Sequence, residues 1–441
     1  MTALTSKELS NKEEQLTREY QNHRAQAKSP LSELNERGFR RFTELKLPLR
    51  KHEMYTYVNL KDILSQPFHF SKEALVTPEL NLIASNTYPD CAQSILVFLN
   101  GEYSETLSNT DNLNDKITIS PLDKAISDPH LADYLYDKAD REDDVFASLN
   151  SAFIRGGLYI KIPAGLKLSQ EIQILFLNGA SGQSLSPLSP RLIIEAESMS
   201  ESKIITKSIN TGSGILDNSQ RDFILADGAT MTHADIQDDH ISSYRFNKYN
   251  VTLSKDSRFL STTAASGGSL VRYHHEAHLK AEGADLSING ISVLAHEEQI
   301  HHYVRVHHEA PRSVSQQMFR NIIQDAAHSS VDTTVIVHEP AQQTDSKQLI
   351  NNLMLSDDGK ADTKPNLIIH ADDVKCAHGA TVGQIAGDQL FYLKSRGLSE
   401  HEARSLLIAS FAKTIIERID SPTVRSQASD MLLGKLEDKN V

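Results

Sequence analysis

The sequence predicts a mainly β protein built around a β-solenoid, with helical regions at both ends. From about residue 150, alternating runs of five or six residues are separated by Gly, Ser, Asn and Asp. This pattern is typical of short strands and turns. An acidic residue followed by a small one recurs at regular intervals in the same part of the chain, whereas both ends have helical periodicity.

The N-terminal region, residues 1–150, is expected to be helical or mixed. Residues 9–28 are charged and rich in Ala and Gln, and they predict a solvated helix. Ser29 and Pro30 predict the start of a second helix, because Ser is a favoured N-cap and Pro is favoured at the first helical position. Residues 80–150 mix short apolar runs with acidic loops and are expected to lead into the central domain.

The central region, residues 151–385, contains an internal repeat of the acidic and small pair. The pairs are Glu197-Ser198, Asp227-Gly228, Asp256-Ser257 and Glu282-Gly283, and their small residues are 30, 29 and 26 positions apart. Repeats of this length predict units that each bury a face on the next unit. A β-solenoid fits best because the strands are short and no helical segment separates them. A β-sandwich also fits the periodicity.

The C-terminal region, residues 386–441, predicts helices. Asp388 and Gly397 are expected to cap and end the first helix, while Ser399 and Glu402 have the spacing of a capping box. The helix that follows the capping box has a wide apolar face, which packs on its own domain or on another protein. This face is formed by Leu406, Leu407, Ile408, Phe411, Ile415, Ile416 and Ile419.

The composition excludes several classes of protein. At 441 residues the chain has room for two or three domains, and its net charge of -13 argues against general nucleic-acid binding. No apolar run approaches the ~20 residues that span a bilayer, so membrane insertion is not expected. With only Cys91 and Cys376, no disulfide framework can form, and a reducing cytoplasmic setting is the simplest expectation.

Histidines are concentrated in one part of the chain. His274 and His278 fall on one face of a strand and His275 on the other, so the cluster is divided. Two interpretations stand: solvated or stacked histidines on solenoid strands, or a direct part in metal transfer. Ten of the 19 histidines lie in this region: His233, His240, His274, His275, His278, His296, His301, His302, His307 and His308.

The common catalytic motifs are absent from the sequence. His296 and His301 are five positions apart, whereas the zinc hydrolase motif H-E-x-x-H requires four. No G-x-S-x-G nucleophile elbow occurs. Neither G-x-x-x-x-G-K-[ST] nor G-x-G-x-x-G occurs, so energy from ATP would have to enter through a partner.

A strand followed by a tight turn and a helix is predicted between Asn366 and Gly397. In its extended part Val374, Cys376 and His378 point to the same side. At ~3.3 Å of rise per residue, the Cys376 and His378 side chains would lie about 7 Å apart. Thiolate and imidazole both suit iron or copper, but two ligands do not complete a tetrahedral site. The remaining ligands must come from elsewhere.

The stretches ADDVKCAHGATVG and LFYLKSRGLSEHEA resemble the C-terminal signature of the SufB/SufD family of iron–sulfur cluster assembly proteins. The resemblance is to SufD members, because Gly379 stands where SufB members carry an acidic residue. It implies a right-handed parallel β-helix in a non-catalytic scaffold subunit in the cytoplasm. This subunit would pair with a SufB-like subunit through the β-helix and with a SufC-like ABC ATPase through the C-terminal helices.

The resemblance also implies functional residues. Cys376 and His378 would lie at an interface where a nascent iron–sulfur cluster is shared with a partner, and His308 is a further metal candidate. No cofactor is expected to be required for folding, and a reduced flavin on the complex is a cofactor that no motif of this sequence indicates. The residues expected to bind the ATPase partner are Ser399, Glu402, Leu406, Phe411 and Ile415.

Two departures and two alternatives accompany this interpretation. Met54 stands where the family usually has Trp, so a packing role is expected there, and Thr333 stands where Gly is common. The first alternative is a metal-dependent enzyme of the β-helix or cupin type that uses the histidine-rich strands. The second is a self-sufficient homodimeric scaffold in which Cys376 and His378 of two copies meet across a two-fold axis.

Overall fold

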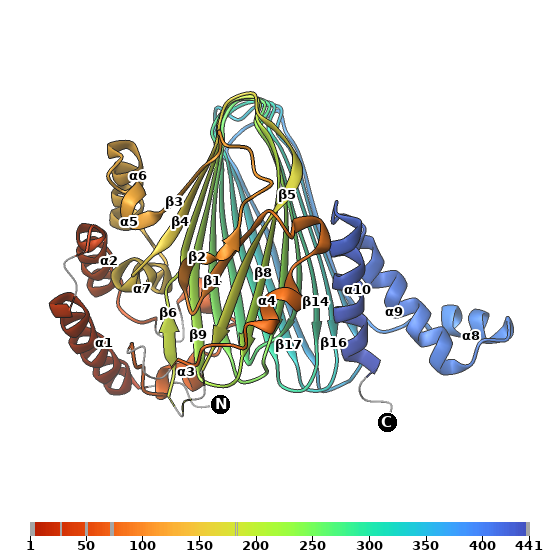
Figure 1. Ribbon diagram of the computed structural model, residues 1–441. Helices are drawn as coiled ribbons and strands as arrows, with labels where there is room; N and C mark the ends of the chain where they lie inside the picture. Colours follow the sequence, from red (N-terminus) through yellow and green to blue (C-terminus); the bar gives the residue numbers. More distant parts are fainter. Residues whose placement is uncertain are drawn as a thin grey trace.

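The computed structural model describes residues 5–437, apart from 27–28, 49–51, 71–74, 181 and 183. It confirms the solenoid prediction: consecutive coils contribute one strand to each of two ten-stranded sheets, and neighbouring strands along the solenoid are parallel. Figure 1 shows the two sheets side by side, with helices at both flanks. The sandwich alternative is wrong because the strands of one sheet are two elements apart in the chain rather than adjacent.

Two strand sets make up the solenoid. Sheet 1 contains β2 (Glu102–Asn109), β1 (Ile95–Leu99), β5 (Lys167–Gly179), β8 (Glu201–Thr211), β10 (Thr230–Asp239), β12 (Arg258–Gly267), β14 (Asp285–Leu294), β16 (Val314–Ile323), β18 (Asp345–Met354) and β20 (Lys375–Gly383). Sheet 2 contains β19 (Lys360–Ile369), β17 (His328–Val337), β15 (Gln299–His308), β13 (Leu270–Leu279), β11 (Tyr244–Leu253), β9 (Ile215–Leu225), β7 (Arg191–Ala196), β4 (Gly157–Ile162) and β3 (Thr118–Pro121), and β6 (Ser186–Leu188) pairs with β9.

The acidic and small pairs lie at one corner of the solenoid, where a strand of sheet 2 leads into the next strand of sheet 1. One residue at each such corner has a positive φ, for example Gly228 at 68° and Gly283 at 75°. At Gly228 and Gly283 the small residue itself takes this conformation, which glycine adopts without strain, whereas at the other two pairs the positive φ falls on Met199 and Asp256. The same corner recurs in two later coils, where Arg312 and Gln343 have a positive φ although neither belongs to a pair of an acidic and a small residue.

The interior between the sheets is apolar along most of the solenoid but also contains paired charges. Arg221 of sheet 2 lies 2.6 Å from Asp235 of sheet 1, and both side chains are buried. The hydroxyl of Tyr249 donates to the same carboxylate at 2.6 Å. Such pairs are tolerated inside a protein only when their polar atoms are satisfied by partners. They therefore fix the position of one sheet over the other.

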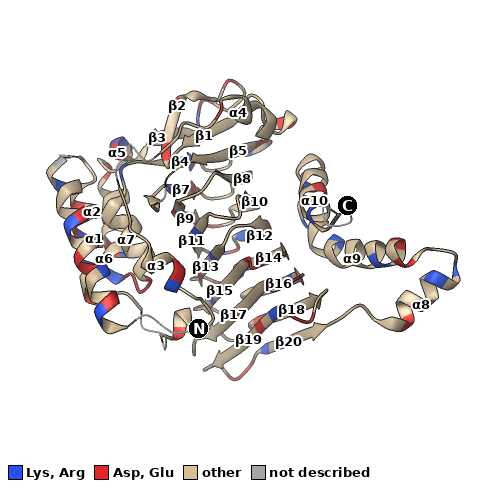
Figure 2. Ribbon diagram, turned by 90° about the horizontal axis from the view of Figure 1, so that it is seen from below, with Lys and Arg blue, Asp and Glu red and all other residues tan. Residues whose placement is uncertain are grey.

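Most of the N-terminal helices cover the outer face of sheet 2, whereas α4 (Asn81–Asn86) and the 3-10 turn Pro89–Cys91 pack against sheet 1 (Figures 1 and 2). Phe146 stacks on Phe246 at a centroid distance of 3.9 Å, and Met54 is buried, as the packing interpretation expected. The second helix begins at Ser32 rather than at Pro30, because Ser29 forms a turn with Ser32. The helices are α1 (Ser6–Gln26), α2 (Ser32–Leu45), α3 (Lys61–Ser65), α4 (Asn81–Asn86), α5 (Leu122–Ala125), α6 (Pro129–Arg141) and α7 (Val145–Phe153), with 3-10 turns Glu53–Tyr55 and Pro89–Cys91.

The C-terminal helices are α8 (Gly387–Ser395), α9 (Glu400–Ile416) and α10 (Pro422–Glu437). Helices α9 and α10 pack on the outer face of sheet 1, and α8 extends away from the body (Figure 2). The capping box of Ser399 and Glu402 is confirmed. Asp388 lies inside the first turn of α8 and does not cap it. Among the described helices, none is long and apolar enough to cross a membrane.

Candidate functional site

The last coil of the solenoid is uncovered. Strands β19 and β20 stand at the ends of their sheets, so each pairs with a single neighbouring strand. None of their residues is buried, whereas the strands of the preceding coils have largely buried faces. Figure 2 shows the two strands at one end of the molecule, with no element stacked beyond them. The space between the sheets is therefore accessible from this end.

Cys376 and His378 lie on the inward face of β20. Their partners in β18 are Ser346 and Gln348, both of which are buried between the sheets. Cys376 is half-buried and packs against the main apolar core, and His378 is exposed. Because no further coil covers β20, these side chains face the interior and can still be reached from outside. The predicted strand and shared face are thus present.

A row of hydrogen bonds connects His308 to the strand position of Cys376. His308 is fully buried; its Nε2 lies 2.8 Å from the Ser315 hydroxyl, which lies 2.8 Å from the Ser346 hydroxyl. Ser346 is the register partner of Cys376. The Nδ1 of His308 is also occupied, at 2.7 Å from Ser313. His308 therefore has contact with the site through serines, and neither ring nitrogen is open to a metal in this arrangement.

Burial determines the protonation of these groups. It lowers the pKa of His308 to about 4, so the imidazole is neutral near pH 7. Burial also raises the pKa of the Cys376 thiol, and this effect exceeds the lowering by a hydrogen bond with the Ser346 backbone. A thiol must lose its proton to bind a metal. Cys376 is consequently a poor ligand until its surroundings change or a metal displaces the proton.

Below His378 lies a small polar network. Gln348, its register partner, donates through Nε2 to the Thr333 hydroxyl at 3.1 Å and to the Asn366 carbonyl at 3.3 Å. The Thr333 hydroxyl in turn donates to Gln317. Thr333 is buried and bonded, so the departure from Gly is accommodated by this network. The network holds Gln348 in place under the open edge.

The residues of α9 that were expected to bind an ATPase partner differ in their exposure to solvent. Ile415 is fully buried against sheet 1, and Phe411 is half-buried, with the Arg320 guanidinium 4.7 Å from its ring centre. Leu406 is 51% exposed. Phe391 and Tyr392 of α8, which are not among the predicted partner-binding residues, are 74% and 56% exposed. The sequence feature that could have indicated them is a pair of adjacent aromatic residues on a short helix. Their exposure depends on α8 extending away from the body, which the sequence does not show.

The histidines between residues 233 and 308 are divided between two faces, as alternation predicts. His275 stacks on Tyr249 at 4.6 Å and His302 on Tyr273 at 5.0 Å, all buried between the sheets. The stacked interpretation is confirmed for these two. His274, His278 and His307 lie on the opposite, outward face, where His274 contacts the buried carboxylate of Asp144 at 2.7 Å.

The family models identify both parts of this architecture. Residues 176–411 match the model for the SUF system FeS cluster assembly SufBD core domain, and residues 10–174 match the SufBD protein N-terminal region. This chain belongs to the SufBD family. The SufBD core match covers the solenoid from β5 to α9, so it includes the open coil with Cys376 and His378.

Named SufBD relatives cover most of the chain. An iron–sulfur cluster assembly SufBD family protein of Synechocystis sp. is 30% identical over 390 residues, covering 85% of this chain and 84% of the relative. The iron–sulfur cluster assembly protein SufD of Escherichia coli is 25% identical over 384 residues, covering 86% and 87%. The chloroplastic protein ABCI7 of Arabidopsis thaliana is 28% identical over 302 residues, covering 66% and 63%. The chain is thus a SufD-like SufBD protein.

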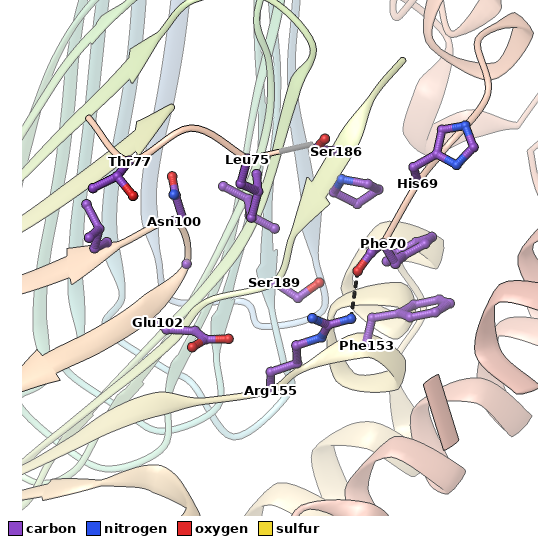
Figure 3. Close-up of a pocket in the computed structure, with 14 residues that line it drawn as sticks. His69, Phe70, Leu75, Thr77, Asn100, Glu102, Phe153, Arg155, Ser186 and Ser189 are labelled. Atoms are coloured by element: carbon purple, nitrogen blue, oxygen red, sulfur yellow. Dashed lines mark hydrogen bonds between the residues drawn. The ribbon is translucent and has the colours of Figure 1, made fainter. Parts of the chain in front are cut away.

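A separate pocket of this SufBD protein lies between the N-terminal segment and the first coils (Figure 3). Phe70 stacks on Phe153 at 3.8 Å, and Arg155 donates to the Phe70 carbonyl at 2.6 Å. Arg155 and Glu102 bring opposite charges to the lining, so the pocket does not select an anion or a cation. It contains no arrangement of described residues that indicates a reaction.

Proposed function

We propose that this chain is the non-catalytic, SufD-like subunit of a cytoplasmic scaffold that assembles iron–sulfur clusters. The observation that carries the proposal is the open last coil, which presents Cys376 and His378 at an exposed edge. A thiolate and an imidazole suit iron, and a nascent cluster needs further ligands from another chain. His308, neutral and hydrogen-bonded at both ring nitrogens, would act from behind by holding the serine row in place beside Cys376.

The edge itself supports pairing with a SufB-like subunit. Unpaired strand edges are avoided in isolated proteins because they pair readily with other strands. Here Val382 of β20 is 53% exposed. Ile368 and Ile369 of β19, the other strand of the last coil, are 44% and 39% exposed. Exposed apolar residues beside open edges are typical of interaction surfaces. A SufB-like strand added at this edge would cover them and bring its own ligands beside Cys376 and His378.

The ATPase partner would bind the surface formed by α8 and the outward side of α9. Phe391, Tyr392 and Leu406 are its exposed apolar members, and Ser399 with Glu402 fixes the start of α9. Phe411 and Ile415 would contribute by anchoring α9 to sheet 1. Because α9 packs on β16, movement of the ATPase would be transmitted to the strands next to the open coil. ATP-driven movement would then change the exposure of His378.

The experiment is co-expression of this chain with the SufB-like and SufC-like proteins of its own organism, with purification through a tag on this chain. The wild type should recover both partners. Val382→Lys should lose the SufB-like partner and retain the ATPase, because the charge lies at the strand edge. Leu406→Lys should weaken ATPase binding alone. Recovery of this chain without either partner, or loss of both partners in either variant, would contradict the proposal.

The open edge also favours a second candidate, a homodimeric scaffold. Two copies paired through β20 would place two thiols and two imidazoles at one interface, which is enough for a four-ligand set. The molecular mass of the isolated chain tests this candidate. A dimer that Val382→Lys converts to monomer would support it, and a monomeric wild type at micromolar concentration would exclude it.

A further inference from the structure

The outer face of sheet 2 carries a compact group of three side chains, Glu276 and His278 of β13 and His307 of β15. His278 and His307 are register partners on adjacent strands, and their rings stack at 4.6 Å. The Nε2 atoms of His307 and His278 lie 2.8 Å and 3.7 Å from Oε1 of Glu276. One ligand atom from each residue falls within 4.8 Å of the others. Two imidazoles and one carboxylate thus converge on one point.

Neighbouring groups orient both imidazoles toward that point. Nδ1 of His278 lies 2.6 Å from a carboxylate oxygen of Glu309, which requires a donor there and leaves the Nε2 lone pair facing Glu276. Nδ1 of His307 lies 3.4 Å from Nε2 of His338. A carboxylate behind a histidine fixes the tautomer and raises the basicity of the nitrogen that binds metal. The pair of Glu309 and His278 has this arrangement.

Glu276 has an oxygen without a hydrogen bond. Its side chain is 14% exposed, and Oε2 is buried and accepts no hydrogen bond among the described residues, with Nε2 of His274 3.4 Å away. A buried carboxylate oxygen is costly unless a donor or a cation satisfies it. The imidazoles of His278 and His307 are 25% and 17% exposed, so an ion can reach the group from solvent.

The surrounding charges leave the group favourable to a cation. Glu276 and Glu309 supply two carboxylates, and Lys138 of α6 is a facing cation. Lys248 and Arg305, two further nearby cations, are paired with the carboxylates of Glu142 and Asp143. One unpaired ammonium therefore opposes two carboxylates. A bound divalent ion would offset the remaining negative charge.

We propose that Glu276, His278 and His307 bind a divalent first-row transition-metal ion, such as Zn²⁺ or Fe²⁺. Two imidazoles and a carboxylate are a ligand set that these ions take, with water in the remaining positions. Binding takes the neutral His307 tautomer whose proton has moved from Nε2 to Nδ1, where it can be donated to Nε2 of His338, so the Nε2 lone pair faces the ion and the imidazole stays neutral. The site is on the outer face of sheet 2, apart from the inward-facing Cys376 and His378 of sheet 1, and it does not depend on the proposed function.

The test is titration of the chelator-treated full chain with Co²⁺, followed by visible d–d absorption and by metal content after gel filtration. The wild type should bind one equivalent, with the intense bands of a four- or five-coordinate ion. Glu276→Gln, His278→Gln and His307→Gln should each weaken binding tenfold or more. His328→Gln is the matched control, because His328 pairs with Asp362 at 2.7 Å on the same sheet. It should bind like the wild type.

Thermal unfolding without metal separates loss of the site from loss of the fold. Glu276→Gln keeps the shape of the side chain, so an unchanged melting temperature with lost Co²⁺ absorption assigns the effect to the ligand. If a histidine variant does not fold, the Glu276→Gln result decides. Absence of a d–d signal at millimolar Co²⁺ in the wild type, or wild-type affinity in a folded Glu276→Gln, overturns the proposal.

Discussion

Burial decides what each histidine of this chain can do. His302 and His378 both face the space between the sheets, but His302 is enclosed by further coils and His378 lies in the last one. Burial lowers the pKa of His302 to about 3, which keeps it neutral and stacked on Tyr273. Alternation in the sequence could predict the face of each side chain. It could not predict where the solenoid is uncovered.

His302 should make the stability of the protein depend on pH. Its folded pKa of about 3 is below the unfolded value near 6.5, so the unfolded chain binds more protons between these values and stability falls as pH decreases. From pH 7 to pH 5 this loss is about 2 kcal/mol. In His302→Gln the decrease in unfolding free energy over that interval should be smaller by this amount, measured by urea unfolding. The exposed His296→Gln is the control, and equal decreases in wild type and His302→Gln would contradict the prediction.

The corner glycines should be sensitive to a single added methyl group. Gly283 has a φ of 75°, and a Cβ there would lie 2.1 Å from Oδ1 of Asp256. Gly283→Ala should lower the unfolding free energy by roughly 1–3 kcal/mol. Gly434→Ala, in helix α10 with no atom within 4 Å of its Cβ position, should raise it by up to about 1 kcal/mol. Thermal melts compare the two, and equal shifts would show that the corner conformation carries no strain.

At the scale of elements, the sequence predicted the solenoid and one of its corners, because the acidic and small pairs recur there and two of the small residues are glycines with a positive φ. It missed the continuation of the corner at Arg312 and Gln343, since those residues adopt the same φ without being small. The capping box of α9 was predictable because it is local. The outward side of α9 was not, because it depends on contacts with strands about 100 residues away, such as that of Arg320 with Phe411.

Replacing Ile415 or Leu406 of α9 by Ala should affect the stability of the chain to very different extents. Ile415 is fully buried, so Ile415→Ala should destabilise the chain by about 2–5 kcal/mol. Leu406 is 51% exposed, so Leu406→Ala should change the unfolding free energy by less than about 0.5 kcal/mol. It should nevertheless weaken binding of the proposed ATPase partner. Melting temperature and pull-down of the partner separate these effects. A large destabilisation by Leu406→Ala would remove this residue from the proposed surface.

At the scale of the whole molecule, the two sheets face different neighbours. Most of the N-terminal helices cover sheet 2, while α4, α9 and α10 pack on sheet 1, and only the end coil is left without a cover among the described elements. The sequence pointed to Cys376 and His378 through a motif. It could not supply the remaining ligands of a cluster, because those would belong to another chain. The serine row behind them was equally hidden, since its members are 7 to 31 residues apart.

In the proposed function, the open coil holds part of a nascent cluster. The most direct measurement is the iron and acid-labile sulfide content of the purified complex with the SufB-like and SufC-like partners, for wild type, His378→Ala and Cys376→Ser. His370→Ala is the matched control, an exposed imidazole beyond β19 in the same coil. The account predicts a severalfold loss of iron and sulfide in His378→Ala, with subunit ratio unchanged and His370→Ala like wild type. Wild-type iron and sulfide in an intact His378→Ala complex would contradict it.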